Sequence, residues 1–211
     1  MYKLYYYPLN ASMAPRFVLE ALGASHELIF VDRKSNSQKS PDYLALNPTG
    51  RIPVLVDEDT VVFESAAICI YLCERHPEIN LLPKAIEKRT MFFQWLMYLT
   101  TTVQTELMIY FYPDKHTGDR SLSNQVRHVQ DGRIVEMFSL LDRELEGKSF
   151  LLGDGISICD YYVFMLSVWA DELSSPPLTF KNLNPYLRKL AARPEIASVC
   201  RHENLDLRLY A

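Results

Sequence analysis

The chain has 211 residues, of which 48% are hydrophobic, and a formal net charge of −4 at neutral pH. This length accommodates one large or two small domains with a sizeable core. The acidic balance provides no electrostatic footprint for nucleic acid or an anionic membrane. Polar residues interrupt every apolar run before the roughly 20 residues that span a bilayer. We therefore expect a cytoplasmic protein that binds neither nucleic acid nor a membrane.

Alternating strands and helices are predicted at the start of the chain. Residues Tyr2 to Tyr7 have the pattern of a strand, and Ser12 to Leu22 that of a helix which Gly23 ends. A second strand is expected from His26 to Asp32, followed by a short helix from Pro41 to Leu46. This order favours a sheet whose first crossover is parallel.

A hairpin follows and leads into another helix. The turn at Asn47 to Gly50 precedes a strand at Val54 to Val56, a second turn at Asp57 to Thr60 and a strand at Val61 to Phe63. The dipeptide Glu64-Ser65 then begins a helix. The hairpin completes a mixed, four-stranded sheet.

Two features at the edges of this hairpin predict a binding site. Pro53 removes a backbone donor and restricts Ile52 to an extended conformation, so that Ile52 can offer its own N–H and C=O outside the sheet. The helix that begins at Glu64-Ser65 presents unpaired N–H groups and partial positive charge to an anion. Together they describe a pocket for a short acidic peptide. Each residue alone also fits a structural role, Pro53 as a strand start and Ser65 as a helix cap.

The rest of the chain is predicted to be helical after a proline-containing linker. The segment Ser157-Ile158-Cys159-Asp160 has the Ser-x-x-acid pattern of a capping box, which predicts the start of a buried helix. Helices are expected over Ala85–Tyr112, Leu122–Leu145, Asp160–Leu173, Leu183–Ala192 and Glu195–His202. The four cysteines, Cys69, Cys73, Cys159 and Cys200, show no CxxC spacing, and the histidines are scattered, so we expect no metal site.

The motifs Ile52-Pro53 and Glu64-Ser65-Ala66-Ala67-Ile68 resemble the glutathione S-transferase family, in particular its bacterial beta/theta-like cytosolic members. The resemblance implies a thioredoxin-like domain over residues 1–76, with a cis-proline, a linker over 77–84 and an all-helical domain over 85–211. It also implies a homodimer that uses glutathione as co-substrate in detoxification.

The resemblance assigns contacts to glutathione. It implies that the Ile52 backbone, before Pro53, pairs with the cysteinyl unit and that Glu64 and Ser65 hold the γ-glutamyl end. Gln38 and Lys39 stand where related classes contact the glycyl carboxylate, and Arg51 stands immediately before Ile52. A solvated surface cation is the alternative for Arg51.

A hydrogen-bond donor is needed to stabilise the glutathione thiolate. In the loop after the first strand, Ala11 stands where the beta class carries a cysteine, so mixed-disulfide chemistry is not expected there. Ser12 is the first candidate donor, Asn10 the second, and Tyr7 a weak third. Ser12 equally fits a helix cap, and the two roles are compatible.

An electrophile pocket is expected along the first part of the long helix, lined by Thr101, Gln104 and Met108, although ordinary packing also explains Thr101 and Met108. The predicted function is a transferase in which the glutathione thiolate attacks small apolar electrophiles. The alternatives are a glutathione-dependent disulfide reductase or isomerase, and a non-catalytic binding protein like the stringent starvation proteins.

Overall fold

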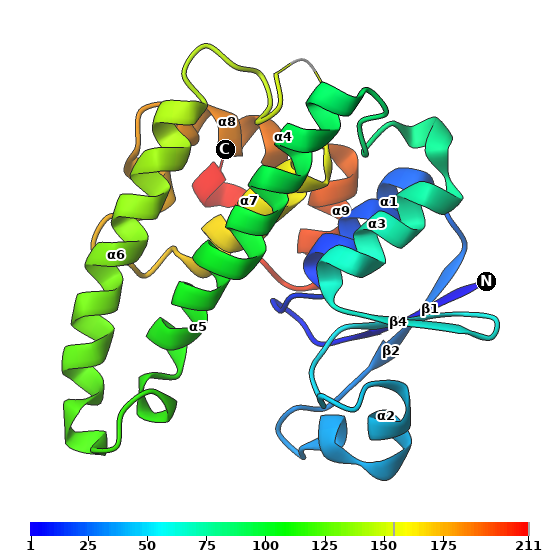
Figure 1. Cartoon of the computed structure of the whole chain (residues 1–211), viewed down its shortest axis with the longest axis horizontal. Coiled ribbons are helices and arrows are strands. Elements are labelled where there is room, and N and C mark those ends of the chain that lie inside the picture. Colours follow the sequence, from blue (N-terminus) through cyan, green and yellow to red (C-terminus); the bar gives the residue numbers. More distant parts are fainter. Residues whose placement is uncertain (154, 211) are drawn as a thin grey trace. The chain divides into compact units, whose positions relative to one another are not determined.

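The computed structural model of the chain describes residues 1–153 and 155–210. Its contacts divide the chain into two compact units. The first consists of Met1–Leu82 with Ala192–Leu209, and the second of Pro83–Ala191 with Tyr210. All the strands lie in the first unit, and the described part of the second unit is helical apart from its loops (Figure 1).

The first unit is built on a four-stranded sheet. Its strands are β1 (Tyr2–Tyr6), β2 (His26–Phe30), β3 (Val54–Asp57) and β4 (Thr60–Phe63), in the order β2-β1-β3-β4. β1 and β2 are parallel, whereas β3 is antiparallel to both β1 and β4. The parallel pair needs a crossover, which α1 (Met13–Leu22) supplies. The predicted mixed sheet is confirmed.

Helices cover both faces of this sheet. In Figure 1, α1 and α3 (Ser65–Arg75) lie on one face and α2 (Pro41–Leu46) lies on the other. α1 ends at Gly23, whose φ of 59° is in the left-handed region that glycine adopts without strain, as predicted. The core between the sheet and α1/α3 contains fully buried apolar side chains, among them Leu4, Phe17, Val18, Leu55, Ile68 and Leu72.

The last helix, α9 (Pro194–His202), belongs to the first unit. It packs on α1, and the Ser198 hydroxyl donates to Glu20 Oε2 at 3.3 Å. The sequence placed this segment in a helical domain over 85–211, and the structure differs there because α9 returns to α1. The boundaries after residues 76 and 84 stay a prediction.

The second unit begins with a helical segment that changes its winding. α4 (Ile86–Met97) leads into a π-helical segment, Tyr98–Val103, and then into α5 (Gln104–Phe111). Fully buried Leu99, Val103 and Leu107 recur every four residues, a longer repeat than the 3.6 of an α-helix. The wider π turn keeps such a repeat on one face. The predicted long helix over 85–112 is present, and the sequence did not indicate the π-helical winding in its middle.

The other helices of the second unit are α6 (Ser123–Glu144), α7 (Ile158–Trp169) and α8 (Leu183–Ala191). α7 is buried along most of its length, as predicted. Its capping box is confirmed, because the Ser157 N–H donates to Asp160 Oδ2 at 2.7 Å. The Tyr186 hydroxyl donates to Asp160 Oδ1 at 2.6 Å, so this buried carboxyl has a structural role.

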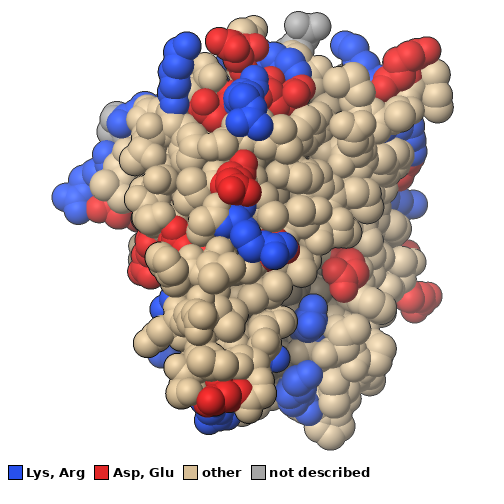
Figure 2. All heavy atoms as spheres, turned by 60° about the vertical axis from the view of Figure 1, so that its left-hand side comes forward, with Lys and Arg blue, Asp and Glu red and all other residues tan. Residues whose placement is uncertain are grey.

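No described helix combines the length and apolar character that crossing a bilayer requires. On the face drawn in Figure 2, Lys and Arg are interspersed with Asp and Glu around a broad uncharged area. Neither sign of charge forms a continuous patch on that face.

Candidate active site

The strand register gathers the predicted binding segments at one end of the sheet. Tyr5 in β1 lies opposite Val54 in β3, and Val54 lies opposite Phe63 in β4. Ile52-Pro53 directly precedes Val54, and Glu64-Ser65 directly follows Phe63. The two motifs are therefore neighbours across the hairpin.

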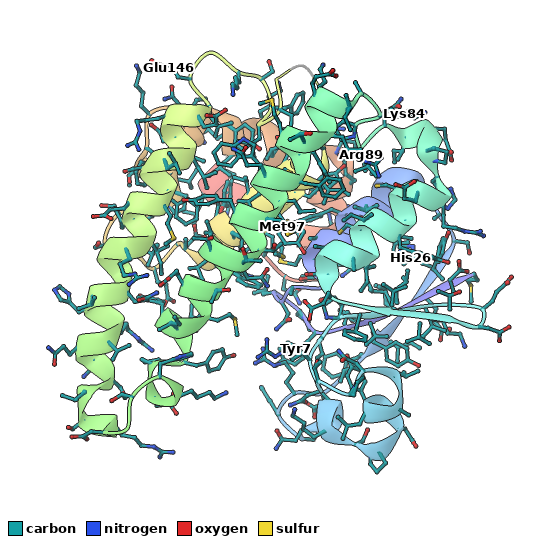
Figure 3. All side chains as sticks on the ribbon, in the orientation of Figure 1. Tyr7, His26, Lys84, Arg89, Met97 and Glu146 are labelled. Atoms are coloured by element: carbon teal, nitrogen blue, oxygen red, sulfur yellow. The ribbon has the colours of Figure 1, made fainter. Side chains whose placement is uncertain are left out.

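The loop after β1 and the segment after β2 begin at the same end. β2 is parallel to β1, and Val31, the residue after β2, donates its N–H to the carbonyl of Tyr6, the last residue of β1, at 2.9 Å. Figure 3 labels Tyr7, which starts the loop that continues to Ser12. The segment after Val31 carries Gln38 and Lys39. All the predicted glutathione contacts thus start from one sheet end.

The peptide bond between Ile52 and Pro53 is cis, as the resemblance implied. The preceding carbonyl, that of Arg51, accepts hydrogen bonds from the Tyr43 hydroxyl and from Asn47 Nδ2, both at 2.8 Å. These two side chains fix the turn before the proline. Within the described residues, the N–H and C=O of Ile52 have no partner. The backbone of Ile52 is therefore available to an extended peptide.

Glu64 stands at the N-terminus of α3 in a conformation that few non-glycine residues adopt. Its φ is 69° and its ψ is 116°, and its side chain is exposed with no capping hydrogen bond. Ser65, which is 6% exposed, is the first residue of the helix. The first-turn N–H groups of a helix lack intrahelical acceptors and carry partial positive charge. This end of α3 suits a carboxylate beside an amine.

Two cations flank the turn that precedes Ile52. Lys39 folds over this turn, and its Nζ donates to the Thr49 carbonyl at 3.1 Å. A Cβ on Gly50 would lie 2.5 Å from Lys39 Nζ and 2.9 Å from the Gln38 carbonyl oxygen, so only glycine permits this approach. Arg51 is exposed and makes no side-chain hydrogen bond within the described residues. The Oε1 atom of Gln38 is buried without a partner.

Ser12 is fully buried, and its hydroxyl closes the loop. Its Oγ donates to the Tyr7 carbonyl at 3.0 Å and accepts from the Tyr7 N–H at 3.4 Å. Ser12 occupies the N-cap position of α1, but its backbone is helical and its side chain makes no capping hydrogen bond. The expectation that Ser12 caps the helix is therefore wrong, because the hydroxyl is used within the loop.

Asn10 offers a second donor in the same loop. Its Oδ1 accepts from the Ala11 N–H at 2.8 Å, and its carbonyl accepts from the Met13 N–H at 2.9 Å. The side chain is half-buried, and within the described residues its Nδ2 has no partner. Tyr7, the weak third candidate, stacks its ring on Phe30 with centroids 5.7 Å apart.

Comparison with known proteins places this geometry in a family. A family model, Glutathione S-transferase, N-terminal domain, matches residues 1–74, and its C-terminal counterpart matches residues 101–194. Glutathione S-transferase F10 of Arabidopsis thaliana is 34% identical over 74% of this chain and 74% of its own length. The chain belongs to the glutathione S-transferase family. As a member it is an enzyme, a transferase that acts with glutathione.

Bacterial members of the glutathione S-transferase family match nearly the whole chain. Glutathione S-transferase GstA of Escherichia coli O157:H7 is 27% identical over 96% of this chain and 99% of its own. A glutathione transferase homologue from Sulfitobacter, solved with bound glutathione, has a TM-score of 0.89 at 22% identity. That match covers 98% of this chain and 99% of the homologue, which confirms the thioredoxin-like and helical fold.

In the helical unit of this glutathione transferase, the three residues predicted for the electrophile pocket keep accessible side chains. Thr101 is exposed, Met108 is 37% exposed and Gln104 is half-buried. The Thr101 hydroxyl donates to the Met97 carbonyl at 2.7 Å, in the π-helical segment. None of the three is among the fully buried residues of this segment, Leu99, Val103 and Leu107, so their side chains are accessible to a ligand.

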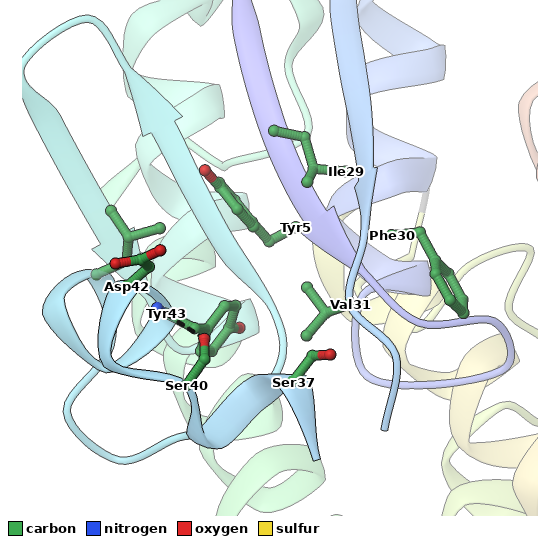
Figure 4. Close-up of a pocket in the computed structure, with 9 residues that line it drawn as sticks. Tyr5, Ile29, Phe30, Val31, Ser37, Ser40, Asp42 and Tyr43 are labelled. Atoms are coloured by element: carbon green, nitrogen blue, oxygen red, sulfur yellow. Dashed lines mark hydrogen bonds between the residues drawn. The ribbon is translucent and has the colours of Figure 1, made fainter. Parts of the chain in front are cut away.

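A surface cavity of about 380 Å³ lies on the α2 side of the sheet. Figure 4 shows Tyr5 and Ile29 from the strands facing Ser40 and Tyr43 from the α2 region. Ser40 accepts from the Tyr43 N–H at 3.3 Å and so caps α2. The residues that line the cavity include none of the predicted glutathione contacts. The cavity nevertheless adjoins the Ile52 turn, because its lining residue Tyr43 donates to the Arg51 carbonyl and Ile52 packs against the cluster of Val31, Tyr43 and Val54.

One hydrogen bond to the Tyr7–Ser12 loop could not be predicted from any sequence motif. The Leu9 N–H donates to Glu203 Oε2 at 2.7 Å across 194 positions of the chain. Glu203 has no motif around it, and its place beside the loop depends on how α9 packs on α1. Leu9 itself adopts a φ of 51°.

Proposed function

We propose that this glutathione transferase lowers the pKa of the glutathione thiol and directs the thiolate to small apolar electrophiles. The observation that supports this most directly is the convergence of Ile52, the start of α3 and the Tyr7–Ser12 loop at one sheet end. An extended-backbone partner, an anion site and hydrogen-bond donors are what a γ-glutamyl tripeptide with a thiol requires.

In the proposed complex, glutathione lies in an extended conformation along Ile52. The free N–H and C=O of Ile52 pair with the cysteinyl backbone, next to the cis bond at Pro53. Ser65 and the first turn of α3 hold the γ-glutamyl carboxylate, and the exposed Glu64 carboxylate faces the α-amine.

The glycyl carboxylate is assigned to the cations at the turn. Lys39 and the exposed Arg51 both lie at the turn that precedes Ile52. The lack of a side chain on Gly50 lets Lys39 approach the backbone of this turn. Gln38 lies beside Lys39, and its proposed role is to donate from its side-chain NH₂ group, because its amide oxygen is an acceptor like the carboxylate itself. A carboxylate bound to two cations is held by charge-assisted hydrogen bonds.

Two donors in the loop are proposed to stabilise the thiolate. Lowering a thiol pKa of about 8.5 by ~2 units requires roughly 2.7 kcal/mol, which one or two hydrogen bonds to the anion supply. The Asn10 Nδ2 is free for sulfur in the described conformation. The Ser12 hydroxyl must first give up its hydrogen bond to the Tyr7 carbonyl before it can donate to sulfur. The thiolate favours this change of acceptor, because a hydrogen bond to a charged acceptor is stronger than one to a carbonyl. Because Ser12 is fully buried, this role also requires the loop to shift.

The electrophile is proposed to bind along Thr101, Gln104 and Met108. Methionine adapts its shape to apolar ligands, and the amide of Gln104 can orient a polar substituent. Gln104 is no acid at neutral pH, so the electrophiles must have good leaving groups or activated double bonds. We further propose that the enzyme is cytoplasmic and acts in detoxification.

A homodimer is proposed as the working form. β4 is an edge strand of the sheet, and its Val61 and Phe63 are 41% and 37% exposed. Exposed apolar side chains on an edge strand favour coverage by another chain, and closed two-fold dimers are the commonest soluble oligomers. Light scattering at micromolar concentration should give twice the 24.4 kDa mass of the chain; a single-chain mass would refute the dimer.

Retention on immobilised glutathione, followed by an ultraviolet titration of the bound thiolate, tests the proposal. We expect retention that free glutathione reverses, and a bound thiol that ionises well below about pH 8.5. Failure to bind would exclude the site, whereas binding with an unshifted thiol pKa would exclude the activation step alone. Ser40→Ala, which removes only the cap of α2, is the matched control and should behave like the wild type.

A further inference from the structure

Glu203 lies at the C-terminal end of α9 with both carboxylate oxygens engaged. Its Oε2 accepts the Leu9 N–H at 2.7 Å, and its Oε1 accepts from Arg16 Nη1 at 3.1 Å. Glu203 is 3% exposed and Arg16 is 2% exposed, so water does not compete for either bond. Burial raises the pKa of Glu203, and the bonds from Leu9 and Arg16 oppose that shift. The carboxylate therefore joins α1 to the loop.

Leu9, the loop residue that Glu203 binds, has an unfavourable backbone conformation. Leu9 has a φ of 51°, in the left-handed region that costs an ordinary residue free energy and persists only where its surroundings impose it. Asn10 follows directly, with its amide nitrogen free, and Ser12 lies two residues further on. The Ser12–Tyr7 hydrogen bonds close the loop from inside, whereas Glu203 holds it from a distant part of the chain.

We propose that Glu203 is a positioning residue that fixes the Leu9 backbone and thereby aims the Asn10 and Ser12 donors at the glutathione sulfur. This inference rests on the proposed function. Hydrogen-bond stabilisation of an anion depends on donors held within a few tenths of an ångström, because distance and angle both set its strength. A loop released at Leu9 still binds the peptide through Ile52 and the start of α3, but stabilises the thiolate less.

The chemistry of the site makes Glu203→Gln the informative variant. An amide has one oxygen, and its NH₂ group is a donor, yet both partners of Glu203, Leu9 N–H and Arg16, are donors. The single amide oxygen keeps the charge-assisted bond from Arg16, because the NH₂ group cannot face a guanidinium, so the bond from the Leu9 N–H is the one lost while the side-chain volume is kept. Ile196→Ala is the matched control, because Ile196 is a fully buried residue of the same helix α9 that makes no hydrogen bond to the loop. Both variants are expected to lower the melting temperature.

The pH profile of kcat/KM distinguishes positioning from a purely structural role. Glu203→Gln should raise the pKa of the bound thiol by about one unit, so that kcat/KM falls about tenfold below that pKa and recovers at alkaline pH. Ile196→Ala should leave the profile in place. Hydrogen exchange of the peptide that contains Leu9 should accelerate in Glu203→Gln only. Glu203→Asp, which keeps the charge, should show a smaller shift and serves if the glutamine variant does not fold.

The outcomes separate this inference from the function on which it rests. A wild-type enzyme whose bound thiol ionises near about pH 8.5 refutes thiolate activation itself. A wild-type pKa that is lowered, together with a Glu203→Gln profile that matches that of Ile196→Ala, refutes the positioning role and leaves the activation intact. Equal exchange rates at Leu9 in the two variants would contradict the attachment directly.

Discussion

Replacing Ser12 by alanine tests which group activates the thiol. The variant removes the hydroxyl that donates to the Tyr7 carbonyl at 3.0 Å and accepts from its N–H at 3.4 Å. The first bond has good geometry and the second is long, so we expect a loss of about 1 kcal/mol of stability. For a protein of this size, that corresponds to a melting temperature lowered by about 2–4 °C.

The effect on the thiol should be larger than the effect on folding. A hydrogen bond to a charged group contributes roughly 1.5–3 kcal/mol, which corresponds to a rise of about 1–2 units in the pKa of the bound thiol. At pH values below both thiol pKa values the transfer rate should therefore fall about ten- to hundredfold. At neutral pH, where the wild-type thiol is already largely ionised, the fall should be smaller, and above both pKa values the wild type and the variant should converge. Glutathione affinity should change less, because the contacts at Ile52 and Ser65 remain.

The assay is an ultraviolet titration of the thiolate in the glutathione complex, with calorimetric affinities and thermal melts. Ser40→Ala provides the control for a serine-to-alanine change in the same unit, because half-buried Ser40 caps α2 and does not touch the loop. If Ser12→Ala leaves the titration unmoved and Asn10→Ala shifts it, the roles are reversed and Ser12 only closes the loop. If neither variant shifts it, the side-chain assignment fails and backbone N–H groups at the start of α1 become the candidates.

Three further outcomes are expected. Ser65→Ala should weaken glutathione binding by roughly 1.5–3 kcal/mol in calorimetry, and an unchanged affinity would contradict the γ-glutamyl site. Burial raises the pKa of Asp171 to about 6, and a hydrogen bond from the Tyr210 hydroxyl only partly opposes this shift. The ionised carboxylate, which predominates at neutral pH, therefore destabilises the folded protein. Asp171→Asn should therefore raise the melting temperature at neutral pH, with a gain that shrinks as the pH falls from about 6 toward 4; a pH-independent gain would refute this origin. Burial raises the pKa of Cys73 and of Cys200 to about 12, so mass spectrometry of the native enzyme incubated with oxidised glutathione should show no adduct at either thiol.

The sequence by itself determined the local structure of the binding end of the sheet. Turn residues, strand alternation and Gly23 defined the strands and α1, and the capping box at Ser157 defined the start of α7. The Ile52-Pro53 and Glu64-Ser65 motifs then placed the chain in its family. These features could be predicted because each depends on backbone preferences or hydrogen bonds within a few residues.

Only the tertiary structure decided how the loop from Tyr7 to Ser12 is held. The Ser12 hydroxyl has a choice of acceptors, and the position of the Tyr7 backbone directs it into the loop instead of onto the helix end. The π-helical turn at Tyr98–Val103 accompanies the four-residue repeat of buried Leu99, Val103 and Leu107, and that repeat is set by packing against neighbouring elements. Glu203 reaches Leu9 because α9 packs on α1, and contacts between residues 194 positions apart depend on packing that no local pattern records.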